Sequence, residues 1–332
     1  MLVEHQDIER KVCSILRILS DSPEPVGARI IARQLKGHGI DLTERAVRYH
    51  LKLMDERGLT RCLGRDGRLI TEQGLEEIKS ALVADKVGFI IAKIELLAFR
   101  TSFDPEKLTG QVVVNTSLYP KARFKKALLA MKDAFKMGLC VSSLVAVAEE
   151  GQKLGDVLVP PGRVGFATLC SVTINGTLLK AGVPMDSRFG GILQLKGSRP
   201  VRFVDLIHYD GSSLDPSEAF IRARMTSVGE AARYGEGKIV ANFREVPALC
   251  RPLAEKVLGK LENAGIKGLV VMGRPGEAVC EIQVGLNRVG IVLLGGLNPV
   301  AAADEAGVPA ESRAMSTLID YRQMVSYWDL LT

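Results

Sequence analysis

The stretch PGRVGFATLCSVTINGTLLKAGVPMDSRFGGIL, residues 161–193, recurs in altered form near the end of the chain. The second copy is RVGIVLLGGLNPVAAADEAGVPAESRAMSTL, residues 288–318. Arg163 corresponds to Arg288 and Ser187 to Ser312, each 125 residues apart, and the tetrapeptide AGVP returns in the same register. Several matches at one offset indicate an internal duplication.

A second match lies upstream of the first. GQVVVN at 110–115 corresponds to GKIVAN at 237–242, 127 residues later, and each run leads to a proline, Pro120 or Pro247. The two offsets differ by two residues, which a small loop deletion explains. We therefore expect two copies of one α/β unit, at about 104–210 and 231–332, related by a pseudo-twofold axis with a cleft or a shared sheet between them.

Hydrophobic periodicity predicts similar elements in both copies. For the first copy we expect strands at 112–115, 143–148 and from Gly165, and a helix at 124–135. For the second we expect strands at 239–242, 268–272, 278–285 and 289–294, and a helix at 252–264.

Length and composition are those of a soluble globular protein with two or three domains. The chain has 332 residues, of which 47% are hydrophobic and 25% charged. Its six cysteines and four histidines are scattered and form no Cys-x-x-Cys pair, so we expect no metal site, no disulfide framework, and cysteines that mostly fill the core. There is no apolar run long enough to span a bilayer and no leader pattern, which predicts a cytoplasmic protein.

Residues 1–85 are typical of a winged helix-turn-helix domain. A first helix has an apolar stripe from Ile8 to Leu19, and the second, at 28–36, is expected to bury Ile30, Ile31 and Leu35. Thr43 is expected to cap a third helix that runs to about Arg57. Two short strands, 60–63 and 68–70, then form the wing, and a fourth helix capped by Thr71 follows.

The third helix and the wing carry the residues expected to contact DNA. At 3.6 residues per turn, Arg45, Arg48, Tyr49 and Lys52 form one stripe opposite the apolar face. Such donors can reach base edges in the major groove, while wing arginines neutralise phosphates. The candidate DNA-binding residues are Thr43, Arg45, Arg48, Tyr49, Lys52, Arg61, Arg65 and Arg68.

The basic charge of this domain is local. Residues 1–85 contain 14 Lys and Arg against 14 Asp and Glu, but residues 29–68 contain 10 against 5. A basic patch of this kind fits a DNA-docking face. The alternative is a solvated face on a winged helix that binds protein.

Residues 87–97 are expected to form a connecting or dimerisation helix, with a buried strand as the competing interpretation of their first half.

The rest of the chain, residues 86–332, resembles a known effector domain. GQVVVNTSL, ATLCSVTINGTLLKAGVP followed by SRFGG, YDGSSLDPSEAFI and NFREVP are similar to segments of the archaeal nitrogen-regulatory repressor family, NrpR. The resemblance implies a homodimeric transcriptional repressor of nitrogen-assimilation genes that leaves double-stranded operator DNA when 2-oxoglutarate accumulates. Familiar members carry two effector domains in tandem, whereas this chain has room for one, so a second effector-domain chain is a possible partner.

An effector with carboxylates needs arginine forks and small polar donors. We expect the effector site to include Cys170, Ser171, Thr173, Ser187, Arg188 and Arg244, with Arg188 and Arg244 as the cations. For any one residue, a structural role is an equal alternative. Asn175-Gly176 could form a hairpin turn, and Ser187-Arg188 a helix cap with a surface ion pair.

A regulator that senses a different small metabolite is the second interpretation. An enzyme is a distant third, because a nucleophile at Cys170 or Ser171 would need a base and only His208 lies in the same half of the chain. The sequence contains no phosphate-binding loop, no dinucleotide fingerprint and no paired-carboxylate motif. We expect no catalytic residues and no cofactor other than the effector.

Overall fold

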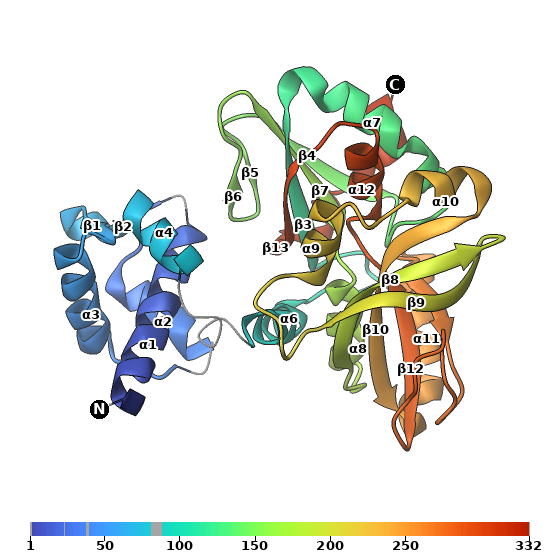
Figure 1. Cartoon of the computed structure of the whole chain (residues 1–332), viewed down its shortest axis with the longest axis horizontal. Helices are drawn as coiled ribbons and strands as arrows, with labels where there is room; N and C mark the ends of the chain where they lie inside the picture. Colours follow the sequence, from blue (N-terminus) through green and yellow to red (C-terminus); the bar gives the residue numbers. More distant parts are fainter. Residues whose placement is uncertain (1, 23, 38–39, 81–87, 332) are drawn as a thin grey trace. The chain divides into compact units, whose positions relative to one another are not determined.

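The structure is a computed structural model that describes residues 2–22, 24–37, 40–80 and 88–331 (Figure 1). The chain divides into two compact units, Met1–Ala92 and Lys93–Thr332. None of the helices in the described part of the chain is both long and apolar enough to cross a membrane.

The first unit is a winged helix-turn-helix. Thr43 caps the third helix by accepting a hydrogen bond from the amide of Ala46 at 3.2 Å, as expected. Ile31 and Leu35 are fully buried, but Ile30 is exposed, so the prediction for that residue is wrong. Ile30 immediately precedes Ile31, and one 100° step around a helix takes a side chain away from the core. The elements are α1 (Leu2–Ser20), α2 (Ala28–Gly37), α3 (Glu44–Glu56), β1 (Thr60–Cys62), β2 (Arg68–Ile70) and α4 (Glu72–Ser80).

The second unit contains two five-stranded sheets. The first sheet has the order β13-β3-β7-β4-β14 and the second has the order β11-β12-β10-β8-β9. Every strand pair in them is antiparallel. The first sheet is built from β3 (Gln111–Pro120), β4 (Leu144–Ala148), β7 (Arg163–Leu169), β13 (Glu311–Asp320) and β14 (Val325–Ser326), and the second from β8 (Asp186–Lys196), β9 (Arg199–His208), β10 (Gly237–Pro247), β11 (Leu269–Met272) and β12 (Arg288–Leu294).

Each repeat contributes to the sheet of the other repeat. β8 belongs to the first repeat but pairs with β10, whereas β13 belongs to the second repeat but pairs with β3. The registers agree as well, because Ser187 is opposite Arg244 and the corresponding Ser312 is opposite Ser117. The duplication expected from the sequence is therefore confirmed, and the two copies are interlocked rather than merely adjacent.

The helices follow the same exchange. α7 (Lys121–Lys136) packs on α12 (Asn298–Glu305) beside the first sheet, and α11 (Arg251–Asn263) packs on α8 (Val172–Lys180) beside the second. Each pair thus combines one helix from each repeat. The remaining helices of at least seven residues are α6 (Phe89–Arg100), α9 (Pro216–Arg222) and α10 (Val228–Tyr234).

Equivalent side chains anchor the two exchanged helices. Thr173 Oγ1 accepts a hydrogen bond from the amide of Val113 at 2.9 Å and lies 3.2 Å from the carbonyl oxygen of the same residue. In the other copy, Asn298 Oδ1 accepts from the amide of Val240 at 2.8 Å, and its Nδ2 donates to the carbonyl of Val240 at 3.0 Å. Both anchors are buried, so they satisfy backbone groups that water cannot reach.

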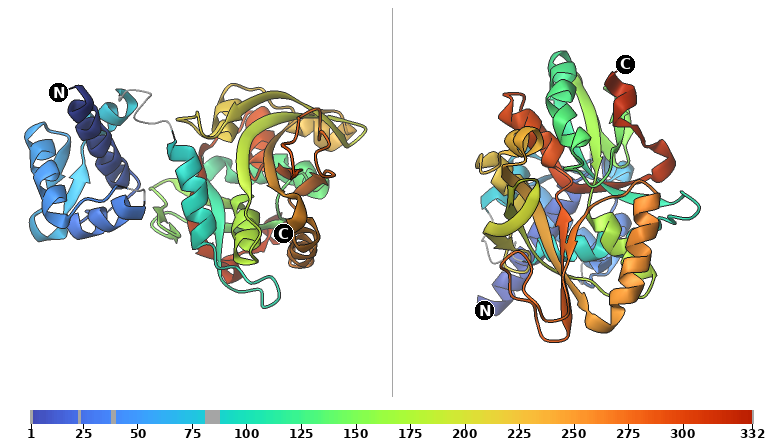
Figure 2. Two further views of the ribbon diagram at one scale, coloured as in Figure 1. Left: turned by 90° about the horizontal axis from the view of Figure 1, so that it is seen from below. Right: turned by 90° about the vertical axis from the view of Figure 1, so that its right-hand side faces the viewer.

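Asn175-Gly176 lies inside α8, so the alternative of a hairpin turn there is wrong. Glycine is required at this position because α6 packs directly against α8 (Figures 1 and 2). A Cβ at Gly176 would lie 2.3 Å from Thr101 Cβ and 2.6 Å from the carbonyl oxygen of Ala98. The described part of residues 87–97 is helical, which excludes the competing strand.

The strand expected at 278–285 is wrong. Cys280 and Glu281 both have positive φ, 50° and 63°, and they form a tight turn between Val279 and Ile282. Two successive residues in the left-handed conformation reverse the direction of the chain. The apolar residues on either side of them therefore lie in a loop, and not in a strand, where they pack against the core. Val279 is 5% exposed and belongs to the main core, which explains the apolar pattern.

Candidate functional site

A pocket opens where the two repeats of the second unit meet. The space between its walls is about 290 Å³, part of it open to solvent, and its enclosed part has room for little more than one water molecule. A larger ligand therefore requires the walls to move apart. The lining residues are Asn115, Cys170, Ser171, Val172, Tyr209, Asp215, Ser217, Asn242, Arg244, Gly296, Leu297, Ala314 and Met315.

The lining contains residues that correspond to one another in the two repeats. Asn115 corresponds to Asn242, and Ser171 to Gly296, at the offsets of 127 and 125 residues. The pocket therefore lies on or near the pseudo-twofold relation between the repeats. A ligand there contacts both repeats at once.

Arg244 is the charged group deepest in this pocket. It lies on β10 and its side chain is 1% exposed. Its guanidinium carbon lies 5.3 Å from the centre of the Tyr209 ring, and among the described residues neither Nε nor Nη1 has a hydrogen-bond partner. A buried cation with unpaired donors is unfavourable unless a ligand provides the missing acceptors. A carboxylate fits, because guanidinium N–H groups donate strong charge-assisted hydrogen bonds to carboxylate oxygens.

The pocket is symmetric in backbone but not in charge. The residue that corresponds to Arg244 is Ser117, whose hydroxyl lies 2.9 Å from the hydroxyl of Ser312. The first repeat thus has a hydrogen-bonded serine pair at the position where the second repeat has a guanidinium with two unpaired nitrogens. The difference predicts one anion per chain, bound in one orientation.

Neutral hydrogen bonds fix the wall beside Arg244. The hydroxyl of Tyr209 donates to Asn242 Oδ1 at 2.5 Å, and Asn242 Nδ2 donates to Ser171 Oγ at 3.2 Å. Burial raises the pKa of Tyr209, so its phenol stays protonated. The wall is therefore held in place before any ligand arrives.

Burial also raises the pKa of the Cys170 thiol, to about 11. At neutral pH the group is a thiol, whereas nucleophilic attack needs the thiolate. Cys170 can line the pocket as a small, weakly polar surface. Among the described residues, no cluster of three or more His, Cys, Asp or Glu side chains could hold a metal ion.

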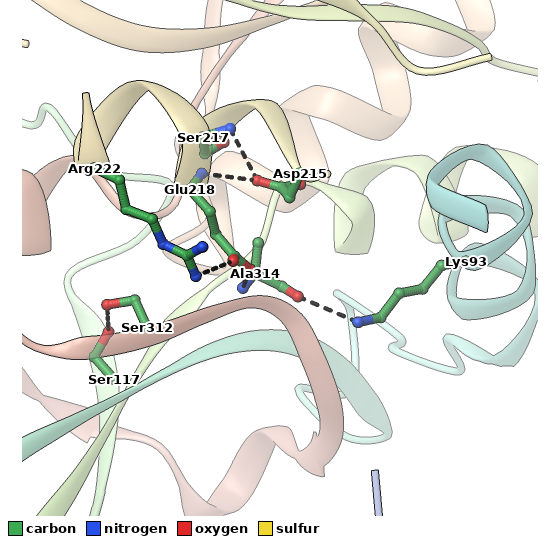
Figure 3. Close-up of polar contacts among 8 residues, drawn as sticks. All are labelled: Lys93, Ser117, Asp215, Ser217, Glu218, Arg222, Ser312 and Ala314. Carbon is green, nitrogen blue, oxygen red and sulfur yellow. Dashed lines mark hydrogen bonds and ion pairs between the residues drawn. The ribbon is translucent and has the colours of Figure 1, made fainter. Parts of the chain in front are cut away.

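A second charged group borders the pocket at the start of α9 (Figure 3). Asp215 caps this helix, and its Oδ1 accepts from the amides of Ser217 at 2.9 Å and Glu218 at 3.2 Å. Burial, followed by the charge of Glu218, raises the pKa of Asp215 to about 6. Glu218 Oε1 in turn accepts from the amide of Ala314 at 2.7 Å, and Lys93 Nζ donates to the carbonyl of Ala314 at 3.4 Å.

The structure brings together Cys170, Ser171 and Arg244 of the six effector residues expected from the sequence. Thr173 instead anchors α8, and Ser187 accepts from Asn175 Nδ2 at 3.1 Å. Arg188 is exposed and forms a surface ion pair with Asp186 at 3.4 Å, as in the structural alternative, although in a strand rather than at a helix cap. The geometry thus favours Arg244 over Arg188 as the carboxylate fork.

Five polar lining residues, Asn115, Tyr209, Asp215, Ser217 and Asn242, were missed in the sequence. Asn115 and Asn242 end the repeated runs GQVVVN and GKIVAN, so their conserved place in both copies was a usable signal. Tyr209 and Asp215 lie in a single-copy segment that reaches the pocket only through the loop between β9 and α9. No periodicity or repeat marks such residues.

In the first unit, the expected DNA-contacting side chains of α3 share an exposed face. Tyr49 is 63% exposed, and Arg45, Arg48 and Lys52 are exposed beside it. Two of the three cations pair within the helix, Arg48 with Glu44 and Lys52 with Glu56. Exposed pairs of this kind are weak, so phosphates or base edges can replace the glutamates. Thr43 serves as the helix cap.

The wing arginines differ from one another. Arg61 and Arg65 are exposed, whereas Arg68 is largely covered and donates from Nε to Asp55 at 2.8 Å. Arg68 thus holds the wing on α3, and Arg61 and Arg65 are the wing cations open to solvent.

Comparison with known proteins gives one consistent family. A model for NrpR regulatory domains NRD1 and 2 matches residues 87–326, and a model for the ribonuclease R winged-helix domain matches residues 13–78. The chain is 41% identical to the global nitrogen regulator NrpRI of Methanosarcina mazei, over 96% of this chain and 98% of that protein.

Two longer relatives carry a similar name. The global nitrogen regulators NrpR of Methanococcus maripaludis and Methanocaldococcus jannaschii are 34% and 35% identical over 93% and 94% of this chain, which spans 54% of each. A crystal structure of a nitrogen repressor-like protein from Methanococcus jannaschii is 30% identical, with a TM-score of 0.61, over 73% of this chain and 98% of that one. The expected winged helix followed by a duplicated α/β domain is confirmed.

Proposed function

The chain belongs to the NrpR family, and we propose from this that it represses transcription of nitrogen-assimilation genes by binding operator DNA, and is released by 2-oxoglutarate. The names of the relatives support the nitrogen-regulatory role. The exposed cations of α3 and the wing support DNA as the partner. The buried, unpaired guanidinium of Arg244 carries the proposal that the pocket takes a carboxylate effector.

The pocket suits an allosteric role because it lies between interlocked repeats and is narrow. A ligand can weaken DNA binding only if it binds better to the arrangement that does not bind DNA. A coupling of about 1–3 kcal/mol changes operator affinity about 5- to 150-fold. Entry of a molecule larger than water must displace pocket walls drawn from both repeats, which provides such a difference between the two arrangements.

We propose a homodimer that reads an inverted repeat, because one winged helix offers a small base-reading surface and twofold assembly doubles it. Two relatives are nearly twice as long as this chain, so a second chain with a further effector domain is the alternative partner.

The test is a fluorescence-anisotropy titration of the full chain on promoter DNA from a nitrogen-assimilation operon of the source organism. We expect specific binding that 2-oxoglutarate weakens and that succinate and glutamate affect much less. If the protein binds this DNA specifically but a different metabolite releases it, the effector assignment is wrong and the assignment as a transcriptional regulator stands. Absence of sequence-specific binding would refute the repressor.

A further inference from the structure

We propose that Lys93 binds the second carboxylate of an effector whose first carboxylate is bound by Arg244, so that the pocket selects dicarboxylates. This inference rests on the proposed function and assigns a residue that the sequence pattern did not single out. Lys93 is half-buried on α6, one turn into the helix that follows residues 81–87.

Lys93 is placed at the pocket wall by one weak contact. Its Nζ reaches Ala314, a lining residue, and is 3.4 Å from the carbonyl oxygen of that residue (Figure 3). This distance is long for a hydrogen bond, and an ammonium group has three donors to offer. No other partner of Nζ is found among the described residues, so the ammonium is available to an incoming carboxylate.

The charge of Lys93 already acts inside the pocket. It lowers the pKa of both Asp215 and Cys170, although burial outweighs it at each group. Cys170 also senses the charges of Arg244 and Asp215. These pKa shifts agree with the position of Lys93 beside the pocket, which its contact with the lining residue Ala314 establishes.

Charge balance makes Lys93 necessary for a doubly charged ligand. With Asp215 ionised, Arg244 alone leaves the pocket neutral, and a dianion would enter with two uncompensated charges. Lys93 adds one positive charge, and protonation of Asp215 adds the equivalent of another. Uncompensated charge in a buried site is strongly unfavourable, so a dianion is accepted only when both cations take part.

The wall that Lys93 contacts is an irregular part of β13. β13 loses its pairing with β3 between Arg313 and Thr317, and Met315 within this bulge has a φ of 49°. The amide of Ala314 is held by Glu218 at 2.7 Å and its carbonyl by Lys93 at 3.4 Å, and the next amide, of Met315, donates to Asn115 Oδ1 at 3.0 Å. A carboxylate that draws Lys93 away removes the longest of these three contacts and leaves the other two in place.

The test is isothermal titration of the full chain with 2-oxoglutarate and with 2-oxopentanoate, which has the same carbon chain but lacks the second carboxylate. We expect the wild-type protein to prefer 2-oxoglutarate. In Lys93→Met, 2-oxoglutarate affinity should fall about 10- to 100-fold, as for loss of one charge-assisted hydrogen bond, while 2-oxopentanoate affinity stays within about threefold. Lys93→Arg should retain the preference, and Lys132→Met, at an exposed lysine of α7, should bind both ligands as the wild type does.

Four outcomes would contradict the inference. If Lys93→Met binds 2-oxoglutarate as tightly as the wild type, or loses both ligands equally, Lys93 does not hold the second carboxylate. If the wild type binds both ligands equally, no second cation operates and the inference fails while the effector function stands. If the wild type binds neither ligand, the proposed effector itself is wrong and the inference fails with it.

Discussion

Replacing Arg244 with methionine should make the effector unit more stable while it removes the response to ligand. The guanidinium is 1% exposed and leaves Nε and Nη1 unpaired. Each buried unpaired donor costs about 1–3 kcal/mol, so the two together disfavour the folded state by at least about 2 kcal/mol. The contact with the Tyr209 ring at 5.3 Å offsets up to about 2 kcal/mol.

Methionine keeps the unbranched apolar stem and has no donor to satisfy, so packing is largely retained. We therefore expect Arg244→Met to raise the free energy of unfolding by about 1–3 kcal/mol. For a unit of this size, each kcal/mol corresponds to about 2–4 °C in unfolding temperature. The matched control is Arg188→Met, where an exposed ion pair worth at most about 1 kcal/mol is lost and little change is expected.

The assay is thermal unfolding monitored by circular dichroism or calorimetry, with and without 2-oxoglutarate. A ligand at 100 times its Kd should stabilise the wild type and Arg188→Met by about 2.7 kcal/mol, and should leave Arg244→Met unchanged. A destabilised Arg244→Met would refute the reasoning, because it would mean that the guanidinium is well satisfied without ligand. If Arg244→Met is stabilised but still responds to the ligand, the carboxylate binds elsewhere and not to Arg244.

Three further results are expected. Arg48→Ala should weaken specific operator binding by about 1–3 kcal/mol, whereas Arg65→Ala should weaken binding to all DNA sequences and reduce its salt dependence. If both variants bind DNA as the wild type does in a mobility-shift assay, the proposed DNA interface is wrong. Burial and the charge of Glu218 raise the pKa of Asp215 in the folded state to about 6, against the opposing charge of Lys93. The folded state therefore holds this proton more tightly than the unfolded state does. The free energy of unfolding should fall by about 3 kcal/mol as the pH rises from about 4 to above 6. Urea unfolding of Asp215→Asn, which keeps the helix cap, should lack this part of the pH dependence, and an unchanged profile would argue against it. Removal of the winged-helix unit should leave a dimer by light scattering, and a monomer would instead place the interface on that unit.

The fold was largely predictable because repetition adds to periodicity. A single strand pattern is ambiguous, but Arg163 with Arg288 and Ser187 with Ser312 at one offset showed that both stretches have the same structure. The exchange of β8 and β13 between sheets was not predictable, since a repeated sequence is compatible with two separate sheets as well as with interlocked ones. Long-range pairing of this kind depends on packing, which no local pattern records.

The site was predictable only in part, for a related reason. Arg188 and Arg244 both follow strand-like residues, and nothing local in the sequence distinguishes an arginine at the surface from one that is 1% exposed. The difference arises because β10 is a central strand of its sheet and Arg244 faces the junction of the repeats. Lys93 lies about 150 residues from Arg244 in the chain, on a helix interpreted as a connector, so its approach to the pocket depends entirely on the tertiary fold.

The exchange of β8 and β13 has a consequence for how such a domain can arise. A protein with a single copy of this unit would lack one strand of its own sheet, with the edge of β3 or β10 left open. It could fill that edge only with the corresponding strand of a second molecule, and would therefore exist as an obligate pair of subunits. Duplication and fusion of its gene would then convert an assembly of two chains into one polypeptide. Once joined, the copies could diverge independently, as Ser117 and Arg244 have done, which a symmetric pair encoded by one gene cannot do.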